Sequence, residues 1–447
     1  MHVEDDQSLL ALLSHLFDLC QGDIASRGLP KGRSYVQFTE KGRYESRSEE
    51  PRFDIVVDRV LLDRQWEGHP SVLPAAETMV RQGTTAGWNV RVDPIEPIEK
   101  LAYWAVMQLS GPLTEHLSNN PAPPFNAAIA LESYERYRVH WTTNQQACRI
   151  TVPLWGLKSD LAELVLDNSV KICAFSPDEK TRLWQGFLVD FGLANIFTYE
   201  SADYCLSITE TSPRPRPSTP EPLLHSARLA ISAIRLAHDG EVFAGPTFAE
   251  LLPPKIFEPT FHDVPYELQL HRGPFAARYL LKSDDSDVVS DIFRSLRACL
   301  PDNNARPLSL ALRRFNLSYA REAPDDQIID LAVALDASLL ADADRDLAYK
   351  LLVRGTALLA GTPKVDEQSA TLAALYSARN KLVHGSKSFP ELKKKELKQI
   401  DPTMLLTRSR AIVRAVLAKY LHRIAAGSTL KSINNELDEL VLKRVGA

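Results

Sequence analysis

The sequence predicts an α+β protein in which a mixed α/β N-terminal domain precedes an all-α helical bundle. Up to about residue 210, short runs rich in β-branched and aromatic residues alternate with helical patterns. Residues 211–222 contain five prolines, which exclude a helix or a central strand. Beyond them, most apolar residues recur at helical spacing. We therefore predict domains at residues 1–210 and 223–447, joined by a linker at 211–222.

The composition is that of an ordinary folded protein, with 45% hydrophobic and 24% charged residues among 447. The formal net charge is -5, so any nucleic-acid contact must be a local positive patch. The five cysteines and eleven histidines show no zinc, redox or metal-ligand spacing along the chain. This pattern predicts free thiols in a reducing compartment, with no metal and no cofactor.

The N-terminus predicts no targeting segment, because acidic residues rather than a basic region follow Met1. No apolar run approaches the length of about 18 residues that a membrane span needs. We therefore expect a cytoplasmic protein that does not contact a membrane.

The N-terminal domain contains several predicted elements, but their pattern leaves its topology and its role open. Apolar spacing predicts helices at residues 7–20 and 98–117, and Ser176 is a predicted N-cap of a third. Short apolar runs predict strands at residues 35–38, 53–57, 60–62, 127–131, 137–141, 148–154 and 170–175.

The proline-rich segment 211–222 favours an extended polyproline conformation, which is typical of a stiff connector. The alternative is that Arg214 and Arg216 contact nucleic acid. Further on, helices are predicted at residues 223–238, 287–300 and 308–319. The proline-containing residues 244–274 are predicted to form an irregular crossing between them.

From Pro324 on, helix starts and stops are clearly marked. Five helices are predicted, with starts at Asp325 or Asp326, Asp344, Asp366, Asp401 and Ser428. The third ends at Gly385, because glycine adopts the left-handed conformation common after a helix. Short connections between helices of this length favour an up-and-down bundle.

A candidate motif lies at the end of that third helix, where Arg379 is separated from His384 by four residues. The same spacing occurs by chance at Arg64 and His69, but no helical pattern surrounds that pair. A histidine at the C-terminal end of a helix is expected to have its imidazolium form favoured by the helix dipole. Asn380 lies four residues before His384, so its amide is expected to orient the ring.

From about residue 223, the chain resembles the HEPN superfamily, most closely its ApeA-like branch. The resemblance rests on residues 379–385, on residues 328–336, and on residues 227–236 with the Gly-Glu-Val that follows at 240–242. It implies a metal-independent endoribonuclease of a toxin, abortive-infection or anti-phage defence system. It also implies a homodimer with a composite active site. Asp336 stands where relatives often carry an acid that faces the motif, so it could pair with Arg379 and hold it. The alternative is that Asp336 is an ordinary mid-helix polar residue that faces solvent.

The resemblance implies two further points about control. One HEPN subgroup carries a tyrosine two residues after the histidine, where a partner nucleotidyltransferase modifies it. Here that position is Ser386, so this mode of control is not implied. Residues 1–210 resemble no family, and we expect them to sense a phage or host trigger or to restrain the enzyme.

The residues suit RNA cleavage by attack of the 2'-hydroxyl. His384 can act as base or acid, which contributes roughly 10²–10⁴ in rate, and Arg379 can clamp phosphate oxygens. Five residues rotate about 140° past a full helical turn, so the two side chains do not share a face. Either the last turn loosens before Gly385, or a partner chain completes the site. Two chains would also supply two imidazoles.

Lysines around the motif predict a local RNA-binding track on an acidic protein. The candidates are Lys381, Lys387, Lys393, Lys394 and Lys395. The alternative is a solvated surface, since lysine runs are common there. Tyr376 could stack on a base, although core packing is the favoured interpretation.

The competing hypothesis is a non-catalytic dimeric helical scaffold or nucleic-acid-binding protein. In that case Arg379 bridges a carboxylate and His384 caps the helix end. Exposure of both side chains in a basic cleft would favour the enzyme, whereas burial would favour the scaffold.

Overall fold

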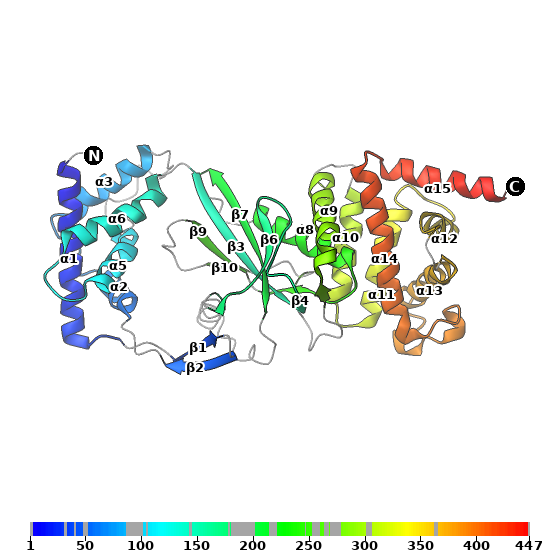
Figure 1. The fold of residues 1–447 in the computed structure, drawn as a ribbon, viewed down its shortest axis with the longest axis horizontal. Coiled ribbons are helices and arrows are strands. Elements are labelled where there is room, and N and C mark those ends of the chain that lie inside the picture. The colour runs from blue at the N-terminus through cyan, green and yellow to red at the C-terminus, as the bar shows by residue number, and fades with distance from the viewer. Residues whose placement is uncertain are drawn as a thin grey trace.

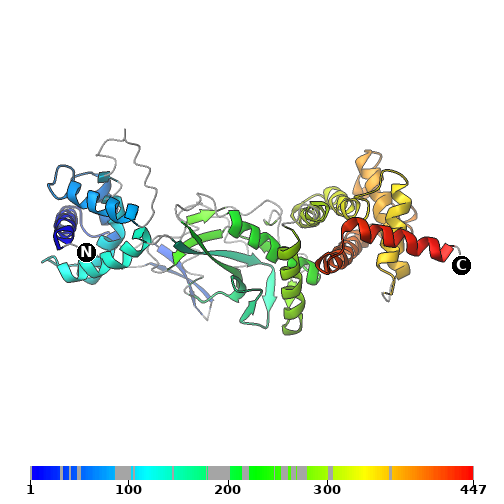
Figure 2. The same cartoon turned by 90° about the horizontal axis from the view of Figure 1, so that it is seen from above.

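The fold is a series of helices, a sheet and further helices along the chain (Figures 1 and 2). The computed structural model describes residues 3–30, 34–39, 42–47, 52–85, 102–103, 106–142, 145–177, 179, 202–213, 221–245, 247–252, 260–262, 268, 279–300, 306–361 and 365–445. Its buried apolar residues form two large clusters, one over residues 9–137 and one over residues 148–437.

The first cluster is the core of an N-terminal helical group, drawn from blue to cyan in Figure 1. Its helices are α1 (Val3–Arg27), α2 (Phe53–Leu62), α3 (Val72–Thr85), α5 (Ser110–Asn119) and α6 (Ala127–Thr142). Between α1 and α2, β1 (Ser34–Thr39) and β2 (Gly42–Arg47) form an antiparallel hairpin. The described part of the predicted N-terminal α/β domain before residue 143 is therefore mainly helical.

Four strand predictions in this region are wrong. Residues 53–57 and 60–62 form α2, and residues 127–131 and 137–141 form α6. The buried residues of α2 are Phe53, Val56, Val57, Val60 and Leu61, which is the spacing of a helix face. The β-branched valines among them favour a strand by intrinsic preference, but packing of this face against other helices decides for a helix. Asn126 accepts hydrogen bonds from the amides of residues 128 and 129 and caps α6.

Other predictions are confirmed in part. The helix at 7–20 lies within α1, and the strands at 35–38, 148–154 and 170–175 coincide with β1, β3 (Gln145–Trp155) and β6 (Val170–Ala174). Of the helix at 98–117, residues 98–101 and 104–105 lie outside the described residues, and α5 begins at Ser110. Most of the helix expected after Ser176 also lies outside them.

The central sheet has the strand order β10-β9-β3-β7-β6-β5, with β8 also paired to β3, and all of these pairs are antiparallel. The remaining strands are β5 (Glu163–Val165), β7 (Tyr204–Pro213), β8 (Phe243–Ala244), β9 (Thr247–Leu252) and β10 (Thr260–His262). Separately, β4 (Leu157–Ser159) and β11 (Tyr279–Leu281) form a short parallel pair.

The predicted division at residues 211–222 is not a division between cores. Strand β7 runs to Pro213, which lies opposite Gln145, and strands from both sides of the proline-rich segment share one sheet. Pro213 is tolerated there because it ends its strand. Residues 214–220 lie outside the described residues, so the polyproline prediction is untested. The cores separate instead between α6 and β3.

The C-terminal region is largely but not wholly helical, because β8–β11 lie within residues 243–281. The all-α prediction for residues 223–447 is therefore wrong in that stretch. Its helices are α8 (Glu221–Ala237), α9 (Ser286–Cys299), α10 (Arg306–Ala320), α11 (Pro324–Leu339), α12 (Leu347–Leu358), α13 (Val365–Val383), α14 (Pro402–Ala425) and α15 (Leu430–Val445). These helices share one hydrophobic core, in which Leu331, Leu375 and Val416 are among the buried apolar side chains.

Helix boundaries follow local signals closely in this region. Asp401 accepts a hydrogen bond from the Thr403 amide at 3.0 Å and caps α14. The cap of α15 is Thr429 rather than the predicted Ser428, because Thr429 and Ser432 exchange side-chain and backbone hydrogen bonds. The helix expected to start at Asp344 begins after Asp346.

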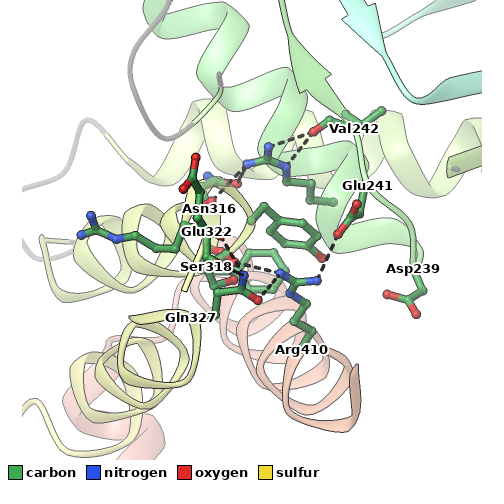
Figure 3. A network of polar contacts seen from close by, with 12 residues as sticks. Asp239, Glu241, Val242, Asn316, Ser318, Glu322, Gln327 and Arg410 are labelled. Carbon is green, nitrogen blue, oxygen red and sulfur yellow. Dashed lines mark hydrogen bonds and ion pairs between the residues drawn. The ribbon is translucent and has the colours of Figure 1, made fainter. Parts of the chain in front are cut away.

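A buried polar network lies where α8 meets the other helices, close to the segment at 239–242 (Figure 3). Arg235 of α8 is fully buried. Its Nε and Nη2 donate to the Val242 carbonyl at 3.2 and 2.8 Å, and its Nη1 donates to Asn316 Oδ1 at 2.9 Å. These acceptors offset the cost of removing a guanidinium from water.

Arg410 of α14 belongs to the same network, which Figure 3 shows from close by. It donates to the Ser318 carbonyl at 2.8 Å and to Gln327 Oε1 at 3.2 Å. The guanidinium carbons of Arg235 and Arg410 lie 4.7 and 4.4 Å from the ring centroid of Tyr319. The network thereby joins α8, α10, α11 and α14. Of these helices, α11 carries Asp336 of the candidate site.

Candidate functional site

The candidate motif lies at the C-terminal end of α13, as predicted. Gly385 has φ 64°, and its amide donates to the Leu382 carbonyl, while the Ser386 amide donates to the Lys381 carbonyl. This pair of hydrogen bonds is the Schellman arrangement that ends many helices. His384 is the last residue before the left-handed glycine, and its side chain is exposed. Its imidazole forms no hydrogen bond or ion pair within the described part of the chain.

Arg379 lies about 1.4 turns earlier on α13, on the side toward Asp336 of α11, with 28% of its side chain exposed. Its Nη1 donates to Asn380 Oδ1 at 3.0 Å, and its Nη2 lies 3.9 Å from Asp336 Oδ2 on α11. Two buried atoms, Arg379 Nε and Asp336 Oδ1, have no hydrogen-bond partner among the described residues. Of the five guanidinium N–H donors, only one on Nη1 has a hydrogen bond of ordinary length to a described residue, so the Nη atoms keep donor capacity that an anion could use.

Asp336 stands where it was expected, facing Arg379, but it holds the arginine loosely. A distance of 3.9 Å is long for a charge-assisted hydrogen bond, which normally measures about 2.7–2.9 Å. Burial raises the pKa of Asp336, and the nearby Arg379 only partly opposes this effect. The pair is thus a half-buried ion pair that lacks its full set of hydrogen bonds.

Asn380 does not have the expected role of orienting the imidazole. Its amide oxygen accepts from Arg379, and only its backbone carbonyl reaches His384, whose amide donates to it at 3.2 Å. That backbone hydrogen bond is the ordinary helical one, so the last turn does not loosen before His384. A loosened last turn therefore does not remove the angular offset between Arg379 and His384. The other explanation offered by the sequence is that a partner chain completes the site.

Two of the five predicted RNA-binding lysines share one carboxylate. Lys381 Nζ and Lys387 Nζ lie 3.2 and 2.6 Å from the same Glu396 oxygen. The other Glu396 oxygen accepts from the Lys393 amide at 3.0 Å, and the Glu396 carbonyl accepts from Ser377 Oγ at 3.1 Å. The hydrogen bond from Lys387 is the main reason that the pKa of Glu396 is lowered to about 2.

The other three candidates differ in their surroundings. Lys394 pairs with Asp401 at 2.9 Å. Lys393 and Lys395 are exposed, and neither side chain forms an ion pair with a described residue. The segment that carries them is packed rather than free, because Leu392, Leu397 and Ile400 are buried. It therefore presents these lysines from a defined backbone.

Tyr376 packs against the main hydrophobic core and is half-buried, which supports the core-packing interpretation over stacking on a base. Sequence reasoning missed Glu396 as a partner of the motif, although its position between Lys387 and Lys398 was a signal that a counter-charge was near. It also missed that Cys173 and Cys205 lie side by side, for which no spacing along the chain gave a signal.

Over the residues that the structure describes, no group of three or more histidine, cysteine, aspartate or glutamate side chains could hold a metal ion. Over the same residues, no helix combines the length and the apolar character needed to cross a bilayer.

Comparison of the chain with protein-family models, with curated proteins and with solved structures gives no match.

Proposed function

We propose that this protein is a metal-independent endoribonuclease of the HEPN type, in which Arg379 and His384 form the catalytic centre. One observation carries the proposal: a half-buried guanidinium with unused donor capacity and an exposed imidazole lie within the last turns of one helix. Lysines lie beside them on a packed segment. Phosphate is the ligand that such donors suit best.

The reaction divides between these groups as follows. An imidazole removes the proton of a ribose 2'-hydroxyl, and the oxygen attacks the adjacent phosphorus. The bond to the 5'-oxygen breaks, and a protonated imidazole supplies that oxygen with its proton. The products are a 2',3'-cyclic phosphate and a 5'-hydroxyl. Arg379 binds the phosphate oxygens on which negative charge grows, with Asn380 and Asp336 as its neighbours.

We propose further that the active form is a homodimer. The reaction uses a base and an acid, and the described part of one chain offers only His384 at this helix end. The regular last turn of α13 leaves Arg379 and His384 about 140° apart around the helix. A second chain would supply the second imidazole and a guanidinium on the facing side.

The biological setting belongs to the same proposal: a cytoplasmic toxin or defence effector that cuts RNA. The N-terminal helical group, with its separate core, would then sense a phage or host trigger or restrain cleavage. Expression of the wild-type chain in a bacterial host should arrest growth, and expression of His384→Ala should not.

The decisive test is cleavage of RNA by the purified protein in EDTA. His384→Ala and Arg379→Ala should each lower the rate by roughly 10²–10⁴. His422→Ala is the matched control, because His422 is also an exposed histidine in the last turn of a helix, α14. Undiminished cleavage by His384→Ala would defeat the proposal, as would an equal loss in the control.

The alternative is a non-catalytic dimeric scaffold or nucleic-acid-binding protein. The carboxylates around the motif favour it, because Asp336 and Glu396 partly satisfy Arg379, Lys381 and Lys387. It predicts that Arg379→Ala lowers thermal stability and that no RNA is cut under any trigger.

A further inference from the structure

Two cysteines that are far apart in the sequence meet on neighbouring strands of the central sheet. Cys173 on β6 lies directly opposite Cys205 on β7 in the antiparallel register. Their Sγ atoms are 3.5 Å apart. Both are free thiols in this structure.

The register of β6 and β7 suits a disulfide. Directly opposed residues of antiparallel strands have Cα atoms about 4.5–5.5 Å apart, and disulfides span Cα distances of about 4.4–6.8 Å. The sulfurs must approach from 3.5 Å to about 2.05 Å. Side-chain rotation alone can supply that change, so Cys173 and Cys205 can bond without moving β6 from β7.

The two thiols have different surroundings. Cys205 is 3% exposed and packs with Phe175, whereas Cys173 is half-buried. A hydrogen bond from Cys205 lowers the pKa of Cys173, and the nearby Lys171 lowers it further against the burial of the thiol. The same contact and burial raise the pKa of Cys205. The accessible sulfur is thus the better nucleophile, and the buried sulfur stands directly behind it.

The carboxylates near Cys173 do not reverse this difference. Glu163 lies opposite Cys173 on β5, but its side chain binds Lys171 Nζ at 2.7 Å. Glu179 and Glu163 both act to raise the pKa of Cys173, and their effects are smaller than those of Cys205 and Lys171.

We propose that Cys173 and Cys205 form a thiol–disulfide exchange site, in which Cys173 attacks a low-molecular-weight disulfide and Cys205 resolves the product. The proposal is independent of RNA cleavage, because neither cysteine belongs to the candidate ribonuclease site. The disulfide formed in this way would be a reversible covalent bond between β6 and β7, and it would link two residues 32 positions apart in the sequence.

The exchange is balanced with oxidised glutathione as the disulfide. The Cys173 thiolate attacks one sulfur, the glutathione disulfide bond breaks, and one glutathione thiolate leaves. Cys205 then loses its proton and attacks the Cys173 sulfur, which releases the second glutathione. Two protein thiols are oxidised by two electrons, and one glutathione disulfide is reduced to two thiols.

The remaining cysteines provide an internal comparison. Cys20, Cys148 and Cys299 are buried in the two large cores. Burial raises the pKa of Cys20 to about 12, which keeps that thiol protonated. Cys173 should therefore react with the disulfide at least roughly tenfold faster than any of these three.

The experiment treats the full-length protein with oxidised glutathione and follows intact mass and unreduced proteolytic peptides. Wild type should lose two hydrogens and yield a peptide pair linked through Cys173 and Cys205. Cys205→Ser should accumulate one glutathione adduct on Cys173, and Cys173→Ser should stay reduced. Cys148→Ser is the control and should cross-link like wild type.

Several outcomes would overturn the proposal. These are a wild-type protein that stays reduced, a linkage through other cysteines, or a Cys173→Ser variant that is modified as fast as wild type. The peptide map of the wild-type chain decides the matter even if a serine variant fails to fold. Circular dichroism of each variant identifies such a failure.

Discussion

Substitution of Glu396 tests whether the lysines beside the motif bind RNA. One carboxylate oxygen holds both Lys381 and Lys387, at 3.2 and 2.6 Å. A phosphate of RNA would have to compete with this carboxylate for the same ammonium groups. Glu396→Gln removes the charge that holds them, while the amide oxygen can still accept from the Lys393 amide, so the segment keeps its backbone anchor.

The size of the effect follows from counterion release. Each phosphate contact with a single strand steepens the dependence of log affinity on log salt by about 0.7, so two freed lysines add about 1.4. Between about 50 and about 200 mM salt, the advantage of Glu396→Gln over wild type should therefore shrink about sevenfold. The variant should bind single-stranded RNA more tightly at the lower salt.

Fluorescence anisotropy with a labelled RNA measures this effect, in a His384→Ala background that prevents cleavage. Glu391→Gln is the matched control, because Glu391 lies on the same segment and loses the same charge. Glu391 accepts hydrogen bonds only from Ser388, and it acts on Lys387 electrostatically without forming an ion pair with it, so its effect on the lysines should be smaller. Equal slopes for the two variants would refute the idea that Lys381 and Lys387 are phosphate ligands held by Glu396.

Two further predictions concern stability. Arg354→Ala should destabilise the helical region by about 3–5 kcal/mol, because buried Arg354 binds Asp342 and Asp438 at 2.8 and 2.7 Å. The control is Arg408→Ala, which removes an exposed ion pair and should lower the free energy of unfolding by less than about 1 kcal/mol. Denaturant unfolding measures both. Burial lowers the pKa of His116, whose ring nitrogens have no partner among the described residues. The unfolded state therefore binds more protons, stability should fall as the pH drops below about 6.5, and His116→Leu should flatten that slope in thermal melts.

The sequence predicted helix boundaries best where a local group decides them. Gly385 ends α13 because its left-handed backbone suits glycine, and Asp401 starts α14 because its side chain reaches an amide two residues on. Both effects act over a few residues, so they can be inferred without the tertiary structure. The same locality explains why the placement of Arg379 and His384 at a helix end was predictable.

Strand and helix were confused where burial decides between them. Val56, Val57 and Val60 favour a strand by intrinsic preference, but they form one buried face of α2 against the other N-terminal helices. Strand β7 was missed for the opposite reason. Its serine and threonine residues suggest an exposed segment, although Cys205, Leu206, Ser207 and Ile208 are all buried. Neither outcome is visible before the packing partners are known.

One unpredicted contact at the candidate site is between adjacent residues, and the others are between segments far apart in the chain. Asn380 was expected to bind His384 because the two are four residues apart, but Arg379 takes its amide oxygen. The partners of Lys381 and of Cys173 come from later segments, Glu396 and Cys205. Sequence spacing predicts which side chains share a helix face, but not which loop or strand packs across them.

The tests divide the functional question into parts that can fail separately. Loss of cleavage in His384→Ala with tighter RNA binding in Glu396→Gln would assign the imidazole to chemistry and the lysines to binding. Tighter binding in Glu396→Gln without cleavage by any variant would leave an RNA-binding scaffold, because counterion release needs no catalysis. Cleavage with an unchanged salt slope would instead keep Arg379 as the main phosphate ligand and give Lys381 and Lys387 a structural role in anchoring Glu396. The ionised Glu396, whose pKa is about 2, is thus the group that separates recognition from catalysis.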